Sequence, residues 1–124
     1  MKLNLVIVDD SALWLSIAEK LALAHPNVAS VTTFDDSLDA WIFLQTNQST
    51  VLMTDIEMPC MNGFSFLSMF SAKLPVISTS TKKNFADDTT EFGAVSFLSK
   101  PFSKKDFNLA LTEVHERVHL QKVG

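Results

Sequence analysis

The chain has few of the features that mark disulfide-bonded or membrane-bound proteins. It contains one cysteine, Cys60, which excludes an internal disulfide and a cysteine metal cluster. No apolar run approaches the roughly 20 residues that a membrane-spanning helix needs. Residues 1–4 lead directly into a strand-like segment, not into a signal peptide. We therefore expect a cytoplasmic protein with no membrane partner.

Positive charge is also scarce. The formal net charge is −4, from 10 Lys and Arg against 14 Asp and Glu. The basic pairs Lys82-Lys83 and Lys104-Lys105 are short and far apart in the sequence, which is typical of solvated surface. Because nucleic acids bind to clustered positive charge, this balance argues against nucleic-acid binding by this segment.

The pattern along the chain is an alternation of strand-like and helix-like segments, which predicts an α/β fold. Its 124 residues, 47% of them hydrophobic, suffice for one domain with one packed interior. Strands are expected at Leu3–Val8, Val28–Phe34, Val51–Asp55, 76–79 and 95–98. Five helices are expected, starting after Ser11, at Asp36 or Ser37, at Gly63, between Ser80 and Gly93, and after Ser103.

The first two predicted helices carry apolar residues at helical spacing. Ser11 is the expected N-cap of the first helix, which His25-Pro26 ends, and Ser103 begins a capping-box spacing in the last helix. The apolar positions of the first two helices are Leu13, Trp14, Ile17, Ala18 and Leu21, and then Leu38, Trp41, Ile42 and Leu44.

Polar side chains stand at the ends of the predicted strands. Asp9 and Asp10 follow the first strand, Asp55 ends the third, Ser80 follows the fourth and Lys100 comes after the fifth. In an open parallel sheet, ligands bind at the carboxyl ends of the strands. We therefore expect these five side chains to converge on one edge.

These residue types suit a site for Mg²⁺ and a phosphoryl group. Magnesium prefers carboxylate, carbonyl and water oxygens, and it relieves the repulsion between crowded carboxylates. Phosphoryl transfer depends on positioning and on stabilising oxygen charge, which Lys100, Ser80 and the backbone N–H groups after Asp55 and Ser80 would do.

Each of these positions also has an ordinary structural interpretation. Asp and Ser often follow strands because they favour turns and helix caps. Lys100-Pro101 is equally typical of a surface lysine before a helix, and we expect the Glu57 carboxylate to project into solvent. The combination of all five positions, in this order, is what favours a functional site.

Four segments resemble the receiver domain of two-component response regulators. They are residues 8–11 (Val-Asp-Asp-Ser), 55–63 (Asp-Ile-Glu-Met-Pro-Cys-Met-Asn-Gly), 75–80 (Pro-Val-Ile-Ser-Thr-Ser) and 93–102 (Gly-Ala-Val-Ser-Phe-Leu-Ser-Lys-Pro-Phe). The resemblance extends over nearly the whole chain. It implies a doubly wound, flavodoxin-like five-stranded parallel sheet in the order 2-1-3-4-5, with residues 1–121 as the receiver domain and 122–124 as a tail.

The resemblance also implies a role for each site residue. Asp55 would be the phosphoacceptor for a histidine kinase or phosphotransfer protein. Mg²⁺ would be held by Asp10, Asp55 and the Glu57 backbone carbonyl, with Asp9 acting through metal-bound water.

The remaining implied roles concern the phosphoryl group and the switch. Lys100 would pair with the phosphoryl group, while Ser80 and Phe97 would form the conformational relay. Thr81 departs from the family pattern, which usually has Ala or Gly there, so its side chain would either crowd the phosphoryl group or add a hydrogen-bond donor.

Two spacings also depart from the family pattern. Only 25 positions separate Asp55 from Ser80, and 13 separate Ser80 from Gly93, so the third and fourth helices or their loops must be short. The fourth helix is weak in composition, with Asp-Asp-Thr-Thr at 87–90. We expect about two turns there.

The sequence thus predicts a phosphorylation-controlled switch or relay that catalyses only its own phosphorylation and dephosphorylation and acts on an unidentified protein target. No output domain follows the last predicted helix, so the chain is either a single-domain regulator or a segment of a longer one. One alternative is a Mg²⁺-dependent phosphohydrolase with Asp55 as nucleophile and Glu57 as general acid. Another is a flavin-binding module, although Asp9 and Asp10 would repel the flavin phosphate.

Overall fold

The computed structural model of the chain describes residues 2–58 and 63–123. Cys60, and part of the segment 55–63 that carries the resemblance, lie outside these residues. The strands are β1 (Leu3–Val8), β2 (Val28–Phe34), β3 (Val51–Asp55), β4 (Val76–Ser80) and β5 (Ser96–Ser99). The helices are α1 (Ala12–Leu23), α2 (Ser37–Thr46), α3 (Gly63–Ser71), the 3-10 turn η1 (Lys83–Phe85), α4 (Ala86–Glu91) and α5 (Lys104–Val123).

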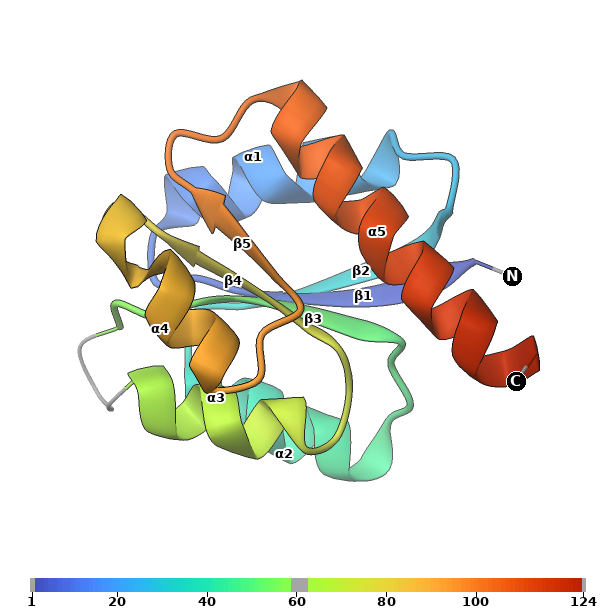
Figure 1. The fold of residues 1–124 in the computed structure, drawn as a ribbon, viewed down its shortest axis with the longest axis horizontal. Helices are drawn as coiled ribbons and strands as arrows, with labels where there is room; N and C mark the ends of the chain where they lie inside the picture. Colours follow the sequence, from blue (N-terminus) through green and yellow to red (C-terminus); the bar gives the residue numbers. More distant parts are fainter. Residues whose placement is uncertain (1, 59–62, 124) are drawn as a thin grey trace.

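The five strands form one parallel sheet in the order β2-β1-β3-β4-β5. Helices α1 and α5 cover one face of this sheet, and α2 and α3 cover the other (Figure 1). The predicted fold class and strand order are therefore confirmed. Within the described residues, no helix is both long enough and apolar enough to cross a lipid bilayer.

Strand β1 shows why its sequence is an almost continuous apolar run. Leu3, Leu5 and Ile7 belong to the core beneath α1 and α5, whereas Val6 and Val8 belong to the core on the other face. Successive strand residues point to opposite faces, so a central strand covered on both sides needs apolar residues at both. The two cores hold the carboxyl end of β1 in a fixed position.

The helix starts follow the expected capping residues. Ser11, Asp36 and Ser103 each accept a hydrogen bond from the backbone N–H three residues further on, at 3.3, 3.4 and 3.0 Å. Each cap satisfies an N–H group that has no partner within the helix. The beginnings of α1, α2 and α5 are therefore encoded locally.

The buried faces of α1 and α2 are narrower than the apolar pattern suggests. Leu13, Leu38 and Ile42 are more than half exposed, whereas Trp14 and Trp41 pack against the two cores. The helical spacing of apolar residues therefore includes positions that the fold does not bury. A helix on the surface of a domain buries only one side, and residues at the margin of that side stay in solvent.

The region between β4 and β5 is short, as the spacing predicted. Helix α4 has six residues, and η1 adds one tight turn before it. The ring of Phe64 on α3 lies 5.5 Å from Phe85 and 5.2 Å from Phe92, measured between ring centroids. These aromatic contacts anchor both ends of α4 against α3.

Candidate functional site

The predicted site residues lie at the carboxyl edge of the sheet. In the strand register, Val8 pairs with Thr54, so the next residues, Asp9 and Asp55, end up side by side. Ser80 is the last residue of β4 and pairs with Ser99 of β5, which places Lys100 directly beyond the same edge. The regular parallel register thus brings together residues that are up to 91 positions apart.

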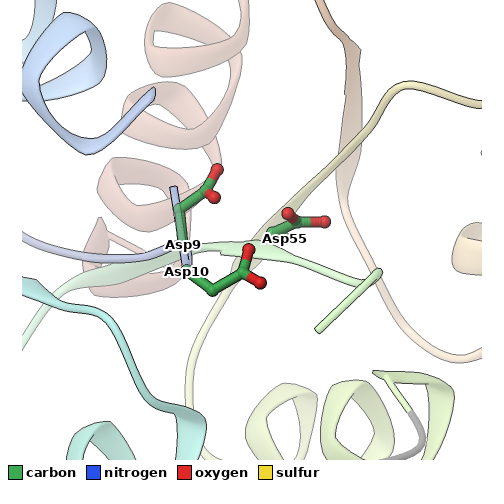
Figure 2. A group of neighbouring side chains, drawn as sticks. All are labelled: Asp9, Asp10 and Asp55. Carbon is green, nitrogen blue, oxygen red and sulfur yellow. The ribbon is translucent and has the colours of Figure 1, made fainter. Parts of the chain in front are cut away.

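Three carboxylates form a compact group at this edge. Asp9, Asp10 and Asp55 each offer an oxygen such that all three atoms lie within 4.8 Å of one another. Figure 2 shows the three side chains gathered at the ends of β1 and β3. Asp9 and Asp55 are only 4% and 7% exposed, whereas Asp10 is exposed.

Lys100 is the cationic partner of two of these carboxylates. Its Nζ lies 2.6 Å from Asp9 Oδ2 and 2.9 Å from Asp55 Oδ2, and the residue is 6% exposed. The other oxygen of each carboxylate accepts a backbone N–H, from Ser11 at 2.9 Å and from Glu57 at 2.8 Å. Both acidic side chains are therefore held rigidly by one charged and one neutral donor.

Burial and charge act against each other within this group. Burial raises the pKa of Asp9, and the hydrogen bonds from Lys100 and Ser11 only partly offset that effect. For Lys100, burial favours the neutral amine, but the two carboxylates outweigh it and the pKa is raised. Lys100 therefore remains a cation at neutral pH, between two carboxylates.

The donor set fits a hard divalent cation. One ammonium group cannot neutralise three carboxylates, so excess negative charge remains where Asp10 faces Asp55. Oxygen ligands at this density are the type that Mg²⁺ prefers. The acidic residues named from the sequence are thus brought together as expected, in a geometry that a magnesium ion would stabilise.

Glu57 differs from the sequence-based expectation. Its carboxylate does not project into solvent but turns toward the end of β4. There Oε2 accepts hydrogen bonds from Ser80 Oγ at 2.7 Å and from the Thr81 N–H and Oγ1, both at 3.0 Å. Lys82 Nζ lies 3.7 Å from Oε1. The sequence marked Thr81 as an extra hydroxyl at this position but did not link it to Glu57.

The same contacts determine the charge state of Glu57. Partial burial by itself would raise the pKa of this carboxyl, but the hydrogen bonds from Ser80 and Thr81 and the charge of Lys82 lower it overall. Glu57 is therefore an anion at neutral pH. It lies on the same edge of the sheet as the three aspartates, joined to Asp55 through its own backbone N–H.

Phe97 lies away from the acidic group. It is half-buried on β5 and lines a hollow of about 390 Å³, whose other wall includes Ala86 near the start of α4 and Leu109 of α5. The structure thus places the two expected relay residues on adjacent strands, with Ser80 fully buried and Phe97 half-buried. The hollow leaves room beside the Phe97 ring.

The sequence of the chain matches a known family over most of its length. Residues 5–112 match the model of the response regulator receiver domain. This chain is a member of that family. The matched segment extends from within β1 to within α5, so it includes every strand end that carries a site residue.

Curated relatives of this receiver domain are larger proteins. It is 33% identical over 106 residues to protein-glutamate methylesterase/protein-glutamine glutaminase 2 of Bordetella avium, covering 81% of the chain and 30% of that protein. The corresponding protein of Hydrogenovibrio crunogenus is 36% identical over 106 residues, with 81% and 28% covered. The receiver chain therefore spans less than a third of the length of these relatives.

Solved structures share the fold. The response regulatory domain of protein mrkE from Klebsiella pneumoniae superposes with a TM-score of 0.85 at 24% identity, covering 94% of this chain and 98% of that one. A Francisella response regulator receiver domain gives a TM-score of 0.81 at 21% identity, with 94% and 98% covered. The chain is thus a receiver domain of a two-component system in both sequence and fold.

Proposed function

We propose that this receiver domain accepts a phosphoryl group on Asp55, in a Mg²⁺-dependent reaction with a histidine kinase or phosphotransfer protein as donor. The single observation that carries the proposal is the placement of the Asp55 carboxylate. It lies at the end of the central strand β3, beside two further carboxylates and 2.9 Å from the Lys100 ammonium. Phosphoryl transfer to Asp55 requires both kinds of neighbour, the carboxylates to hold a metal ion and the ammonium to pair with phosphoryl oxygens.

The proposed reaction is a nucleophilic displacement at phosphorus. An Asp55 carboxylate oxygen forms a bond to phosphorus while the bond from phosphorus to the imidazole nitrogen of the donor breaks, and the imidazole leaves with its electron pair. Hydrolysis of the acyl phosphate by water later restores the carboxylate. The second step releases inorganic phosphate. In both steps the phosphoryl oxygens carry negative charge, which needs neutralising groups around it.

The acidic group would supply the metal ligands for this step. We assign Mg²⁺ to Asp10, Asp55 and the Glu57 backbone carbonyl, with Asp9 acting through a water molecule on the metal. When bound, the ion supplies Lewis-acid stabilisation of phosphoryl oxygens. The buried Lys100 would then exchange one of its carboxylate partners for a phosphoryl oxygen.

Ser80 and Phe97 would convert phosphorylation into a change of surface. The Ser80 hydroxyl moves toward a phosphoryl oxygen, and the Phe97 ring turns into space near the end of β4. An unidentified protein target would recognise the altered surface. The curated relatives carry a methylesterase/glutaminase name for much longer proteins, and an effector of that class is one candidate partner or fused domain.

The phosphohydrolase alternative gains no support from the geometry. It requires Glu57 to act as a general acid beside Asp55. The Glu57 carboxylate is instead turned toward β4, where three donors hold it as an anion. An acid in that state is a poor proton donor to a leaving group.

Incubation with acetyl phosphate and Mg²⁺ tests the proposed function. Intact-mass and peptide mass spectrometry should find one added phosphoryl group, on Asp55, that is stable in acid and labile in base. Asp55→Asn should remove it, while Asp35→Asn, an exposed acid after β2 on the same edge, should leave it unchanged. A modification elsewhere with Asp55 intact would contradict the assignment.

A further inference from the structure

The side chain of Glu57 makes contacts that the acceptor role of Asp55 and the metal-binding roles alone do not explain. The Glu57 side chain lies across the end of β4, where a single carboxylate oxygen receives three hydrogen bonds. Its side chain is 25% exposed, compared with 60% for its charged neighbour Lys82. Water can hydrate a carboxylate at the surface. A surface position alone therefore does not explain why Glu57 accepts three hydrogen bonds from the protein.

Two of the three donors are groups that the proposed reaction also needs. The Ser80 hydroxyl and the Thr81 backbone N–H are among the hydrogen-bond donors that would surround a phosphoryl group on Asp55. A carboxylate oxygen and a phosphoryl oxygen are both anionic acceptors, and both favour converging donors of this kind. While Glu57 holds these donors, a phosphoryl oxygen cannot.

We infer that the Glu57 carboxylate is an internal competitor for the phosphoryl-binding donors, and that acceptance of a phosphoryl group on Asp55 displaces it. The inference rests on the proposed function and adds its regulation. In the unmodified domain, the Glu57 carboxylate occupies the donors of Ser80 and Thr81. It returns to the same donors when the phosphoryl group is lost. It therefore lowers the affinity of the site for phosphoryl groups and their analogues.

Thr81 is the residue that makes this competition effective. Its hydroxyl adds a third hydrogen bond to the same Glu57 oxygen, 3.0 Å away. An alanine or glycine at this position would leave only the Ser80 hydroxyl and one backbone N–H. The Thr81 side chain thus stabilises the contact of Glu57 with these donors, and it has no need to contact the phosphoryl group.

Displacement of Glu57 also changes the chain beyond β4. The Ser80 hydroxyl that donates to Glu57 also accepts the Lys82 backbone N–H at 2.9 Å. The Lys82 ammonium lies 3.7 Å from the Glu57 carboxylate and 5.3 Å from the centre of the Phe85 ring in η1. Release of Glu57 therefore frees Lys82 and alters the support of η1 and α4.

A double-mutant cycle tests the competition. Beryllofluoride, a phosphoryl analogue, is titrated with Mg²⁺ into four forms of the full chain: wild type, Glu57→Ala, Thr81→Ala and the double variant. Bound fluoride is read by fluorine NMR. Because hydrogen bonds to charged groups are worth more than neutral ones, Glu57→Ala should tighten binding by about 10-fold and Thr81→Ala by about 3-fold. In the Glu57→Ala background, Thr81→Ala should have no further effect.

The Thr81 variant separates the contact from simple charge repulsion, because it leaves the Glu57 charge in place. Asp35→Ala removes one exposed negative charge from the same edge and should change affinity less than 2-fold, as expected for a screened surface charge. An unchanged affinity in Thr81→Ala, or an equal Thr81 effect with and without Glu57, would overturn the inference.

Phosphorylation by acetyl phosphate keeps this test distinct from the test of the proposed function. If Asp55 is modified normally but the cycle shows no coupling, only the role of Glu57 is wrong. If no variant accepts a phosphoryl group on Asp55, the proposed function fails, and the competition fails with it.

Discussion

Replacing Lys100 by methionine is expected to destabilise the domain in the absence of metal. Methionine keeps an unbranched apolar stem but lacks the terminal ammonium, which lies 2.6 Å from Asp9 and 2.9 Å from Asp55. Two nearly buried carboxylates would then face each other, with Asp10 close to both. Neither would have a cation to offset its burial.

The magnitude follows from the burial of the three groups. Removing one partner from a buried ion pair costs roughly 3 to 5 kcal/mol, because an uncompensated charge remains. Asp9 already has a raised pKa, so it can take up a proton and limit the cost. We therefore expect a loss near the lower end, about 3 kcal/mol, which corresponds to roughly 10 °C in Tm for a domain of this size.

Magnesium should restore much of this stability. A divalent ion bound to the folded state stabilises it by about 2.7 kcal/mol when its concentration is 100 times the Kd. In the wild-type domain, the ion must bind beside a cation that already holds two of the carboxylates. In Lys100→Met that competition is gone, so Mg²⁺ should bind more tightly and raise Tm more than in the wild type.

Urea and thermal unfolding at pH 7.5, in EDTA and across a Mg²⁺ titration, measure both effects. Lys105→Met on the exposed side of α5 is the matched control, because it loses the same charge from a solvated position and should change stability by no more than about 0.5 kcal/mol. A Lys100→Met variant within 1 kcal/mol of wild type in EDTA, or one that gains no more from Mg²⁺ than wild type does, would refute this account of the site.

Two further predictions concern the metal and the segment after β4. Asp10→Ala should abolish both Mg²⁺ binding, followed through Trp14 fluorescence, and phosphorylation, because the approaching anions are no longer neutralised; Ser80→Ala should keep both while weakening the conformational response. Normal Mg²⁺ affinity in Asp10→Ala would exclude the metal role. Amides of residues 82–92 should exchange with solvent faster than those of α5 and gain protection when beryllofluoride binds; equal protection in both states would contradict ordering of this segment.

The fold could be predicted because its signals are local or periodic. A continuous apolar run identified β1 as a strand buried on both faces, and capping residues such as Ser11 and Asp36 marked where helices begin. Strand ends followed by polar residues were enough to predict which polar side chains converge, because parallel strands end at one edge. Element ends differed by only a residue or so, as with β4, which includes Ser80.

The features that could not be predicted are side-chain directions that depend on distant partners. Helical spacing identifies which residues share a face of α2, but not how wide an arc the rest of the fold covers, so Leu38 and Ile42 could not be assigned to solvent. The orientation of Glu57 depends on Ser80 and Thr81, more than 20 positions away at the end of another strand. No pattern local to β3 contains that information.

Among the residues that the structure describes, two groups of contacts occupy hydrogen-bond donors at this edge of the sheet. Lys100 is held between Asp9 and Asp55, while Ser80 and the backbone of Thr81 hold Glu57. A phosphoryl group on Asp55 would need donors from both groups, so its binding is an exchange of partners and not a simple addition.

The free energy of that exchange is a difference between similar anionic contacts, and it is therefore small compared with the strength of any one of them. Modest changes in charge can therefore shift this exchange of partners in either direction. Bound Mg²⁺ would act on one group by replacing Lys100 as the counterion of the carboxylates. The Glu57 carboxylate acts on the other by occupying the donors at the end of β4. Rearrangement at both places, and not occupancy of Asp55 alone, is what would carry the signal to η1 and α4.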